Sequence, residues 1–375
     1  MQVTRFASID IGNDGLKGYF GSLEEKMHIP NVIAKEEMER EVIELEKDTL
    51  NGLHVMINSP SLSQQTGTFV VGNLATRYVD NERMGTHSVK AESDQSLIVL
   101  LTALAVDATK RFTEINSVIK ANYLLSTGLP LDEVKAKKRK VLKERLLNKT
   151  HEVTFLQTPK LQGKKVKIEF TDVLVNGEGV GAFLDLTTDD RLQAKSPELH
   201  NQNLMINDIG GISTDTAVIL AGGEIDNTAS KGIDEGTLAY LEEISEGIYK
   251  ELQVKLKSLK HVVDIIKNGK TVSVRGQKIP ANHIIDPVLR RAAKTQMKHI
   301  ESVWEKAPEV EKSIQIGGGA MILREYMEEL NKEKQYPLVF IETQNEDEAM
   351  WMIARAYWKA LQLYVKHKNL QVVSV

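Results

Sequence analysis

The sequence predicts an α/β protein built from two related lobes. The chain has 375 residues, which is enough for two or more cores of domain size. One pattern, an apolar strand ending at an Asp, a glycine-rich turn and a second apolar strand, occurs at 6–20 and again at 204–220. A further glycine-rich turn, at 317–319, stands between an apolar strand and a helix. Strands that alternate with helices in this way are typical of α/β folds.

Composition excludes several classes of function. With 48 Lys and Arg against 52 Asp and Glu, the formal net charge of −4 argues against a surface dedicated to nucleic acid or membrane. The absence of Cys excludes disulfides, thiolate metal sites and cysteine catalysis, and it fits a reducing cytoplasm. No apolar run approaches the roughly 18 residues that span a bilayer, and the N-terminus has no charged-then-apolar leader. We expect a soluble, cytoplasmic protein.

The order of elements suggests where each domain begins and ends. We expect domain I at 1–184 plus 345–375, with a small subdomain inserted at about 21–92. Domain II is expected at 185–344, with a subdomain inserted at about 237–309.

The first lobe should contain one buried helix and several strands. Apolar residues lie all round 96–112, which predicts a helix packed on a sheet. The basic stretch 132–147 predicts a helix with a solvated face, which we favour over a DNA site. The remaining predictions are an acidic helix at 36–46, strands at 53–57, 67–71, 118–125, 164–170 and 171–175, and a helix that begins within 176–184.

The second lobe should contain longer helices. Charged residues lie on one side of 237–259, which predicts a long amphipathic helix. Beyond it we predict a short β segment at 271–279, a helix at 285–304, a strand at 313–316 with a helix to about 331, a strand at 337–341 and a helix from 347 to about 364.

The two repeated turns have the composition of a phosphate-binding site. Glycine lets the backbone approach a phosphate chain closely, so that several N–H groups can converge on it. Asp10 and Asp208 each follow an apolar strand, and two such acids facing one polyphosphate can hold Mg²⁺, mostly through water. Lys17 would add a point charge to the phosphates. The alternative is a pair of tight turns with structural aspartates.

The turn Gly317–Gly318–Gly319 is suited to the same ligand. It precedes a helix whose N-terminus could face a nucleotide. By itself such a turn is an ordinary strand-to-helix connection. Together, the three glycine-rich turns are explained most simply by a nucleotide in the cleft between two lobes.

These motifs resemble those of the superfamily of actins, sugar kinases and heat-shock chaperone ATPases. Asp10–Lys17 corresponds to its first phosphate motif, Asp208–Asp215 to its second and Ile316–Leu323 to its adenosine motif. The first connecting motif is similar to Glu178–Phe183, and the second lies more loosely within 345–356.

Further segments resemble the ParM-type bacterial plasmid-segregation actins and their archaeal relatives. They are 69–75, 90–101, and 126–131 with the basic stretch after it. One departure is that Asn13-Asp14 replaces the usual hydroxyl residues of the first loop, which leaves open which side chain touches the γ-phosphate.

The resemblance implies a Mg²⁺-dependent nucleoside triphosphatase that works by positioning and charge neutralisation. Glu178 would orient the attacking water, while Asp10 and Asp208 would organise Mg²⁺ and its waters. The alternative for Glu178 is an exposed acid at a helix start. Arg291 is expected to contact the nucleotide, and its alternative is a solvated side chain. The expected nucleotide-binding residues are Gly12, Asn13, Asp14, Gly15, Lys17, Gly210, Gly211, Ser213, Thr214, Asp215, Gly317, Gly318, Gly319, Ala320, Met321 and Arg291.

The resemblance also implies a biological role. We expect polar, head-to-tail filaments that move plasmid DNA through a DNA-binding adaptor protein, with ATP or GTP as substrate and no direct membrane contact. A sugar or acetate kinase of the same superfamily is the alternative, but it needs a substrate-binding base, of which we find no clear example. A chaperone-like ATPase is less favoured, because it would need a client-binding domain after the last helix. A static scaffold that has lost hydrolysis is also less favoured, because it would not need Asp10, Glu178 and Asp208.

Overall fold

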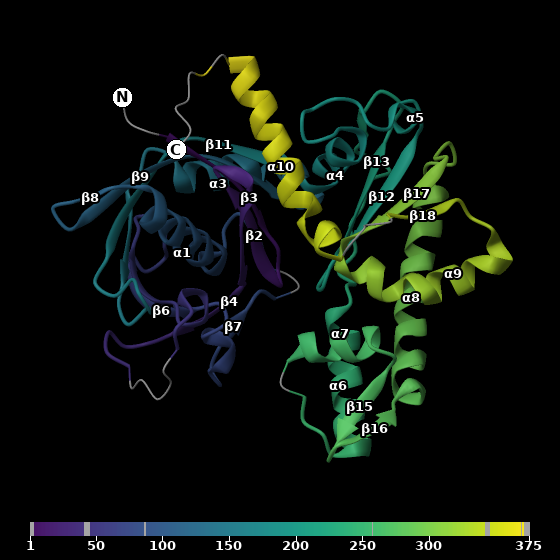
Figure 1. Cartoon of the computed structure of the whole chain (residues 1–375). Coiled ribbons are helices and arrows are strands. Elements are labelled where there is room, and N and C mark those ends of the chain that lie inside the picture. Colours follow the sequence, from purple (N-terminus) through teal and green to yellow (C-terminus); the bar gives the residue numbers. More distant parts are fainter. Residues whose placement is uncertain are drawn as a thin grey trace. The chain divides into compact units, whose positions relative to one another are not determined.

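The computed structural model describes residues 4–40, 46–85, 88–256, 258–341, 346–368 and 370. The chain divides into two compact units, both of which mix helices and strands as predicted (Figure 1). Unit 1 comprises residues 1–185, 189–193 and 351–375, and unit 2 comprises 186–188 and 194–350.

Unit 1 is built on an eleven-stranded mixed sheet. Along the sheet the order is β3-β2-β1-β9-β11-β10-β5-β6-β4-β7, and β8 pairs with β9. The central strands β1, β9 and β11 are parallel, and β9 is buried over most of its length, as expected for the centre of a parallel sheet. The strands are β1 Thr4–Ile11, β2 Gly15–Phe20, β3 Ser22–Pro30, β4 Val32–Lys35, β5 His54–Asn58, β6 Thr66–Val71, β7 Glu82–Arg83, β8 Glu114–Ile115, β9 Val118–Leu129, β10 His151–Phe155 and β11 Lys165–Gly177.

Helix α1 (Asp94–Arg111) is the buried helix predicted for the first lobe. It packs on β9, β10 and β11 and also contacts β2, β3 and β4, so the sheet surrounds it (Figure 1). The Ser93 hydroxyl caps its N-terminus by accepting from the Ser96 N–H, and Lys110 and Arg111 lie in its last turn. Strands β3 to β7, which come from the segment 21–92, belong to the same sheet as β1.

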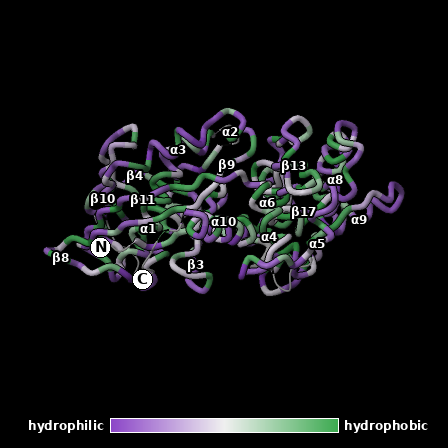
Figure 2. The backbone as a smooth tube through the Cα atoms, turned by 90° about the horizontal axis from the view of Figure 1, so that it is seen from above, coloured by the Kyte–Doolittle hydropathy of each residue, from purple (hydrophilic) through white to green (hydrophobic). Residues whose placement is uncertain are grey.

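The basic stretch forms two helices rather than one. α2 (Leu131–Lys135) and α3 (Lys138–Leu146) are separated by Lys137, whose φ of 61° ends the helical path. Most of α3 is hydrophilic in Figure 2, in contrast to α1. One basic residue does not face solvent: the Arg145 guanidinium donates to the carbonyls of Ser61, Ala91 and Ser93 and to the Asp94 carboxylate. The predicted solvated face is therefore wrong for Arg145.

Two helices carry the chain between the units. α4 (Glu178–Thr187) follows β11 directly, and the chain first leaves unit 1 within this helix. After residues 189–193, which belong to unit 1, the chain stays in unit 2 until it returns to unit 1 within α10 (Glu346–Lys368). In unit 1, the Ser8 hydroxyl donates to the Ala354 carbonyl at 2.7 Å, and the Phe6 and Trp358 rings meet edge to face. These contacts fix α10 against β1.

Unit 2 has a five-stranded sheet of order β14-β13-β12-β17-β18 and a separate β15–β16 hairpin. Its elements are α5 Pro197–His200, β12 Leu204–Ile209, β13 Thr214–Ile219, β14 Ile225–Asp226, α6 Leu238–Leu252, α7 Leu259–Lys267, β15 Thr271–Val274, β16 Gln277–Pro280, α8 Asn282–Trp304, β17 Lys312–Ile316, α9 Gly317–Lys334 and β18 Leu338–Phe340.

The two units repeat one strand arrangement. In β3-β2-β1-β9-β11 of unit 1 and β14-β13-β12-β17-β18 of unit 2, the first three strands form an antiparallel meander, and two parallel strands follow. Within this arrangement β1 and β12 occupy equivalent positions. The repeated sequence pattern therefore reflects a repeated topology.

Three sequence predictions differ from the structure. The amphipathic helix predicted at 237–259 ends at Leu252, because Gln253 is left-handed, and α7 then begins after the Ser258 cap. The β segment predicted at 271–279 is a hairpin that turns at Arg275 and Gly276. In the acidic stretch 36–46, residues 36–40 and 46 are not helical, and 41–45 lie outside the described residues.

Each unit has its own apolar core. In unit 1 the core lies between the sheet and α1, whereas in unit 2 it lies among the sheet, α6, α8 and α9. Over the described ranges, no helix combines the length and the apolar character that crossing a membrane requires.

Candidate functional site

The first glycine-rich turn joins β1 to β2 in unit 1. Asp10 lies opposite Lys17 in the strand register, and the Gly12 N–H donates to the Gly15 carbonyl at 3.1 Å. A Cβ on Gly12 would lie 2.9 Å from both this carbonyl and an Asp14 carboxylate oxygen. The turn therefore has no room for a side chain at this position, which is the physical reason for glycine there.

Charged groups gather beneath this turn. The Lys17 ammonium is 3.4 Å from the Asp14 carboxylate. Burial raises the pKa of Asp10 to about 6, Lys17 and Lys90 oppose the rise, and Glu178 adds to it. The charges of Asp14, Lys17, Lys90 and Glu178 therefore all act on the Asp10 carboxylate at the end of β1.

Glu178 is the first residue of α4, and its side chain is buried. Its carboxylate is 2.8 Å from the Lys90 ammonium, and the two side chains are only 8% and 9% exposed. The alternative of an exposed acid at a helix start is therefore wrong. The backbone at Lys90 is fixed in turn, because the Glu133 carboxylate accepts hydrogen bonds from the backbone N–H groups of Lys90 and Ala91 at 2.7 and 3.0 Å.

Sequence reasoning missed Lys90 and Glu133 as site residues. Lys90 is the first residue of the stretch 90–101 that carries part of the family resemblance, but nothing local distinguishes it from other lysines. Its role depends on a partner 88 positions away.

The second glycine-rich turn joins β12 to β13 in unit 2 and repeats the first. The Gly210 N–H donates to the Ser213 carbonyl at 2.9 Å. Asp208 lies directly opposite Asp215, so the two carboxylates share one face of the strand pair. Lys17 lies opposite Asp10 in unit 1, whereas the equivalent position opposite Asp208 in unit 2 is occupied by an acid, Asp215.

The third glycine-rich turn packs on the second. Gly317 has a φ of +85°, and a Cβ there would collide with an Asp208 carboxylate oxygen and approach the Ile209 carbonyl at 2.7 Å. A Cβ on Gly319 would also meet the Ile209 carbonyl at 2.7 Å, whereas Gly318 is exposed and has open space around it. The N-terminus of α9 therefore lies beside the end of β12.

A buried polar network supports the second turn. The Thr214 hydroxyl donates to the Glu235 carbonyl at 2.8 Å, and Gln296 donates to the same carbonyl at 2.9 Å. Two residues further along β13, the Thr216 hydroxyl donates to the Asn207 side chain at 2.6 Å and lies 2.8 Å from His299 Nε2. Sequence reasoning did not find this network, because its members come from separate strands and from α8.

The other predicted residues have varied surroundings. Asn13, Gly211 and Ser213 are half-buried on the turns, Asp14 is exposed, Ala320 is buried and Met321 is half-buried in the first turn of α9. Arg291 is exposed on α8, where it pairs with Glu243 of α6. That ion pair belongs to the helical surface rather than to a glycine-rich turn.

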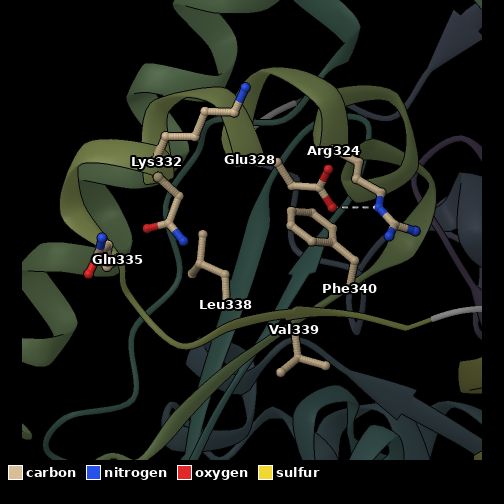
Figure 3. A pocket seen from close by; sticks show the side chains of 8 residues that line it. Arg324, Glu328, Lys332, Gln335, Leu338, Val339 and Phe340 are labelled. Carbon is tan, nitrogen blue, oxygen red and sulfur yellow. Dashed lines mark hydrogen bonds and ion pairs between the residues drawn. The ribbon is translucent and has the colours of Figure 1, made fainter.

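A hollow of about 510 Å³ lies in unit 2 between the C-terminal part of α9 and β18. In it, the Arg324 guanidinium pairs with Glu328 at 2.7 Å and lies over the Phe340 ring (Figure 3). Its lining includes none of the residues predicted for the phosphate, metal or adenosine contacts.

Comparison with known proteins gives two matching family models and many similar solved structures. The model "Actin like proteins N terminal domain" matches residues 8–181, and the model "Alp7A C-terminal domain" matches 203–340. No curated protein sequence matches the chain.

The similar structures cover nearly the whole chain. Bacillus thuringiensis ParM with AMPPNP is 24% identical, with a TM-score of 0.73 over 97% of this chain and 99% of that chain. The actin-like protein Alp7A is 17% identical, with a TM-score of 0.78 over 98% and 99%. The archaeal actin homolog Ta0583 is 17% identical, with a TM-score of 0.70 over 96% and 100%. The predicted fold class, an actin-like α/β fold, is confirmed.

Proposed function

Because the chain belongs to the actin-like proteins of the ParM and Alp7A type, we propose that it forms nucleotide-dependent filaments that segregate plasmid DNA. The observation that carries the proposal is the repeated end of β1 and β12, where an Asp, a glycine-rich turn and an antiparallel return strand occur in both units. B. thuringiensis ParM has been solved with ATP, ADP and AMPPNP, which supports nucleotide binding by this type of fold.

We propose that the turns of both units bind one ATP or GTP. Lys17 supplies positive charge to the phosphates from unit 1, and the backbone N–H groups of the glycine-rich turns supply hydrogen bonds. From unit 2, the N-terminus of α9 presents the first N–H groups of a helix beside Asp208. These residues would bind and orient the nucleotide.

Mg²⁺ fits the acids at the strand ends. In the part of the chain that the structure describes, no group of three or more His, Cys, Asp or Glu could hold a metal by itself. Mg²⁺ does not need such a group, since it usually binds one or two carboxylates together with phosphates and water. Asp10 and Asp208, with Asp215 beside the latter, would hold it and its waters, and it would neutralise charge on the phosphates.

Glu178 is proposed to orient the water that attacks the terminal phosphate. Its buried carboxylate is fixed by Lys90, whose backbone is in turn fixed by Glu133. A rigid, water-excluded acceptor of this kind favours the attacking geometry, and phosphoryl transfer requires little else from the protein. Hydrolysis is proposed to follow assembly into polar, head-to-tail filaments in the cytoplasm, with a DNA-binding adaptor protein linking them to plasmid DNA.

The proposal is tested by right-angle light scattering after addition of Mg-ATP or Mg-GTP, with phosphate release followed in parallel. We expect scattering to rise with one or both nucleotides, and phosphate to appear with a delay. The absence of a scattering rise with either nucleotide at micromolar protein would refute the filament proposal. Phosphate transfer to a sugar or acetate without scattering would favour the kinase alternative.

A further inference from the structure

Asn31 is a buried residue between β3 and β4 that contacts the first glycine-rich turn twice. It is 1% exposed. Its backbone N–H donates to the Asp14 carbonyl at 3.1 Å, and its side-chain Nδ2 donates to the Gly12 carbonyl at 3.0 Å. One residue therefore binds the carbonyl groups on both sides of Asn13.

These two hydrogen bonds set the direction of the N–H groups of the turn. In a planar trans peptide the C=O of one residue and the N–H of the next point in opposite directions, and no peptide bond among the described residues is cis. Since the carbonyls of Gly12 and Asp14 point toward Asn31, the N–H groups of Asn13 and Gly15 point away from it. Two N–H groups directed to one side are what an anion needs from a turn.

Asn31 is itself held by Gln95 in the first turn of α1. The Gln95 Nε2 donates to the Asn31 backbone carbonyl at 2.6 Å and reaches its side-chain oxygen at 3.3 Å. The contact to the oxygen leaves the Asn31 Nδ2 facing Gly12, which fixes the orientation of the amide. Gln95 is 8% exposed, so water competes little for these bonds.

We propose that Asn31 is a positioning residue for the phosphate chain of the nucleotide, and that Gln95 supports it. The inference rests on the proposed function, since it assigns how one of the nucleotide-binding turns is shaped. Asn31 acts on the phosphates through the backbone of Asn13 and Gly15 and does not need to touch them.

The test compares Asn31→Ala with a matched control, Asn122→Ala. Asn122 is a 9% exposed amide on β9 of the same sheet, and its Nδ2 donates to the hydroxyls of Thr4 and Thr171 at 2.8 and 2.6 Å. Two quantities are measured for each variant. One is the affinity for fluorescent ATP, GTP and their diphosphates, and the other is hydrogen–deuterium exchange of the peptide 10–17 in the nucleotide-free protein.

We expect Asn31→Ala to weaken triphosphate and diphosphate binding about three- to tenfold, which is the loss of one or two modest hydrogen bonds. We also expect faster exchange of the peptide 10–17. Asn122→Ala should change neither quantity, although both variants lower the thermal midpoint. Gln95→Met, which keeps the volume but removes the donor, should give a smaller effect in the same direction.

Equal effects of Asn31→Ala and Asn122→Ala on affinity would overturn the inference, and so would unchanged exchange of 10–17 in Asn31→Ala. If the wild-type protein binds no nucleotide, the proposed function and the phosphate role of Asn31 both fail. The exchange measurement needs no nucleotide, so it would still show whether Asn31 orders the turn, which distinguishes the two failures.

Discussion

Replacing Lys90 by Met should expose the energetic link between Lys90 and Glu178. The two charged groups are 2.8 Å apart, and each side chain is less than 10% exposed. Loss of the ammonium leaves a buried carboxylate without its cation, which typically costs about 3–5 kcal/mol in the free energy of unfolding. Since Lys90 also favours the ionised form of Asp10, its loss should weaken binding at the proposed phosphate site as well.

The assay is a double-mutant cycle with Lys90→Met, Glu178→Gln and the double variant, measured by urea denaturation. Because the double variant leaves neither charge alone, it should be less destabilised than the sum of the single variants by about 1–3 kcal/mol. A control is Lys138→Met, which removes the half-buried partner of the exposed Glu92 and should cost no more than about 1 kcal/mol in the free energy of unfolding. Additive single effects would refute the coupling, and phosphate release at the wild-type rate in Glu178→Gln would refute the role of Glu178 in hydrolysis.

Two further predictions concern a glycine and a histidine. Gly317→Ala should lower the free energy of unfolding by at least about 2 kcal/mol and weaken nucleotide binding, because the added methyl group collides with Asp208. The control Gly276→Ala has the same φ of +85° but open space around it, so it should cost only about 1 kcal/mol and leave binding unchanged. Equal losses of stability in the two variants would show that the collision with Asp208 is not the cause. Burial lowers the pKa of His299 to about 4. The contribution of His299 to the free energy of unfolding should therefore be complete above the unfolded pKa of about 6.5, and it should fall by about 1.4 kcal/mol per pH unit as the pH drops toward 4. His299→Gln should show a correspondingly shallower dependence of urea stability on pH, and an unchanged slope would show that His299 takes up its proton in the folded state.

The strands and glycine-rich turns could be predicted because their signals are local. The apolar strand before Asp10 and the one before Asp208 are each followed by glycine in the sequence, and the structure closes both turns with the same N–H to carbonyl hydrogen bond. The buried helix α1 was likewise predicted from its own apolar residues. Helix ends were harder, because Lys137 and Gln253 adopt left-handed backbone without a Gly or Pro to mark the break.

The supporting side chains could not be predicted because their signals are not local. Asn31 acts on Gly12 and Asp14, and Lys90 acts on Glu178, so their roles depend on which strands and helices become neighbours. A single Asn between two strands is typical of many turns. The sequence thus predicts the residues of the turns themselves better than it predicts the residues that hold them.

The glycine-rich turns of both units are proposed to serve one Mg²⁺-nucleotide. The most direct measurement is the affinity for ATP and GTP with Mg²⁺ and with EDTA, in the wild-type protein and in Asp10→Asn and Asp208→Asn. We expect Mg²⁺ to tighten wild-type binding by about tenfold or more, and either variant to lose most of this gain while its affinity in EDTA stays at or above that of the wild type. If either variant keeps the full gain from Mg²⁺, then that unit's acid does not contribute to the nucleotide site, and the proposal that both units serve one Mg²⁺-nucleotide is wrong.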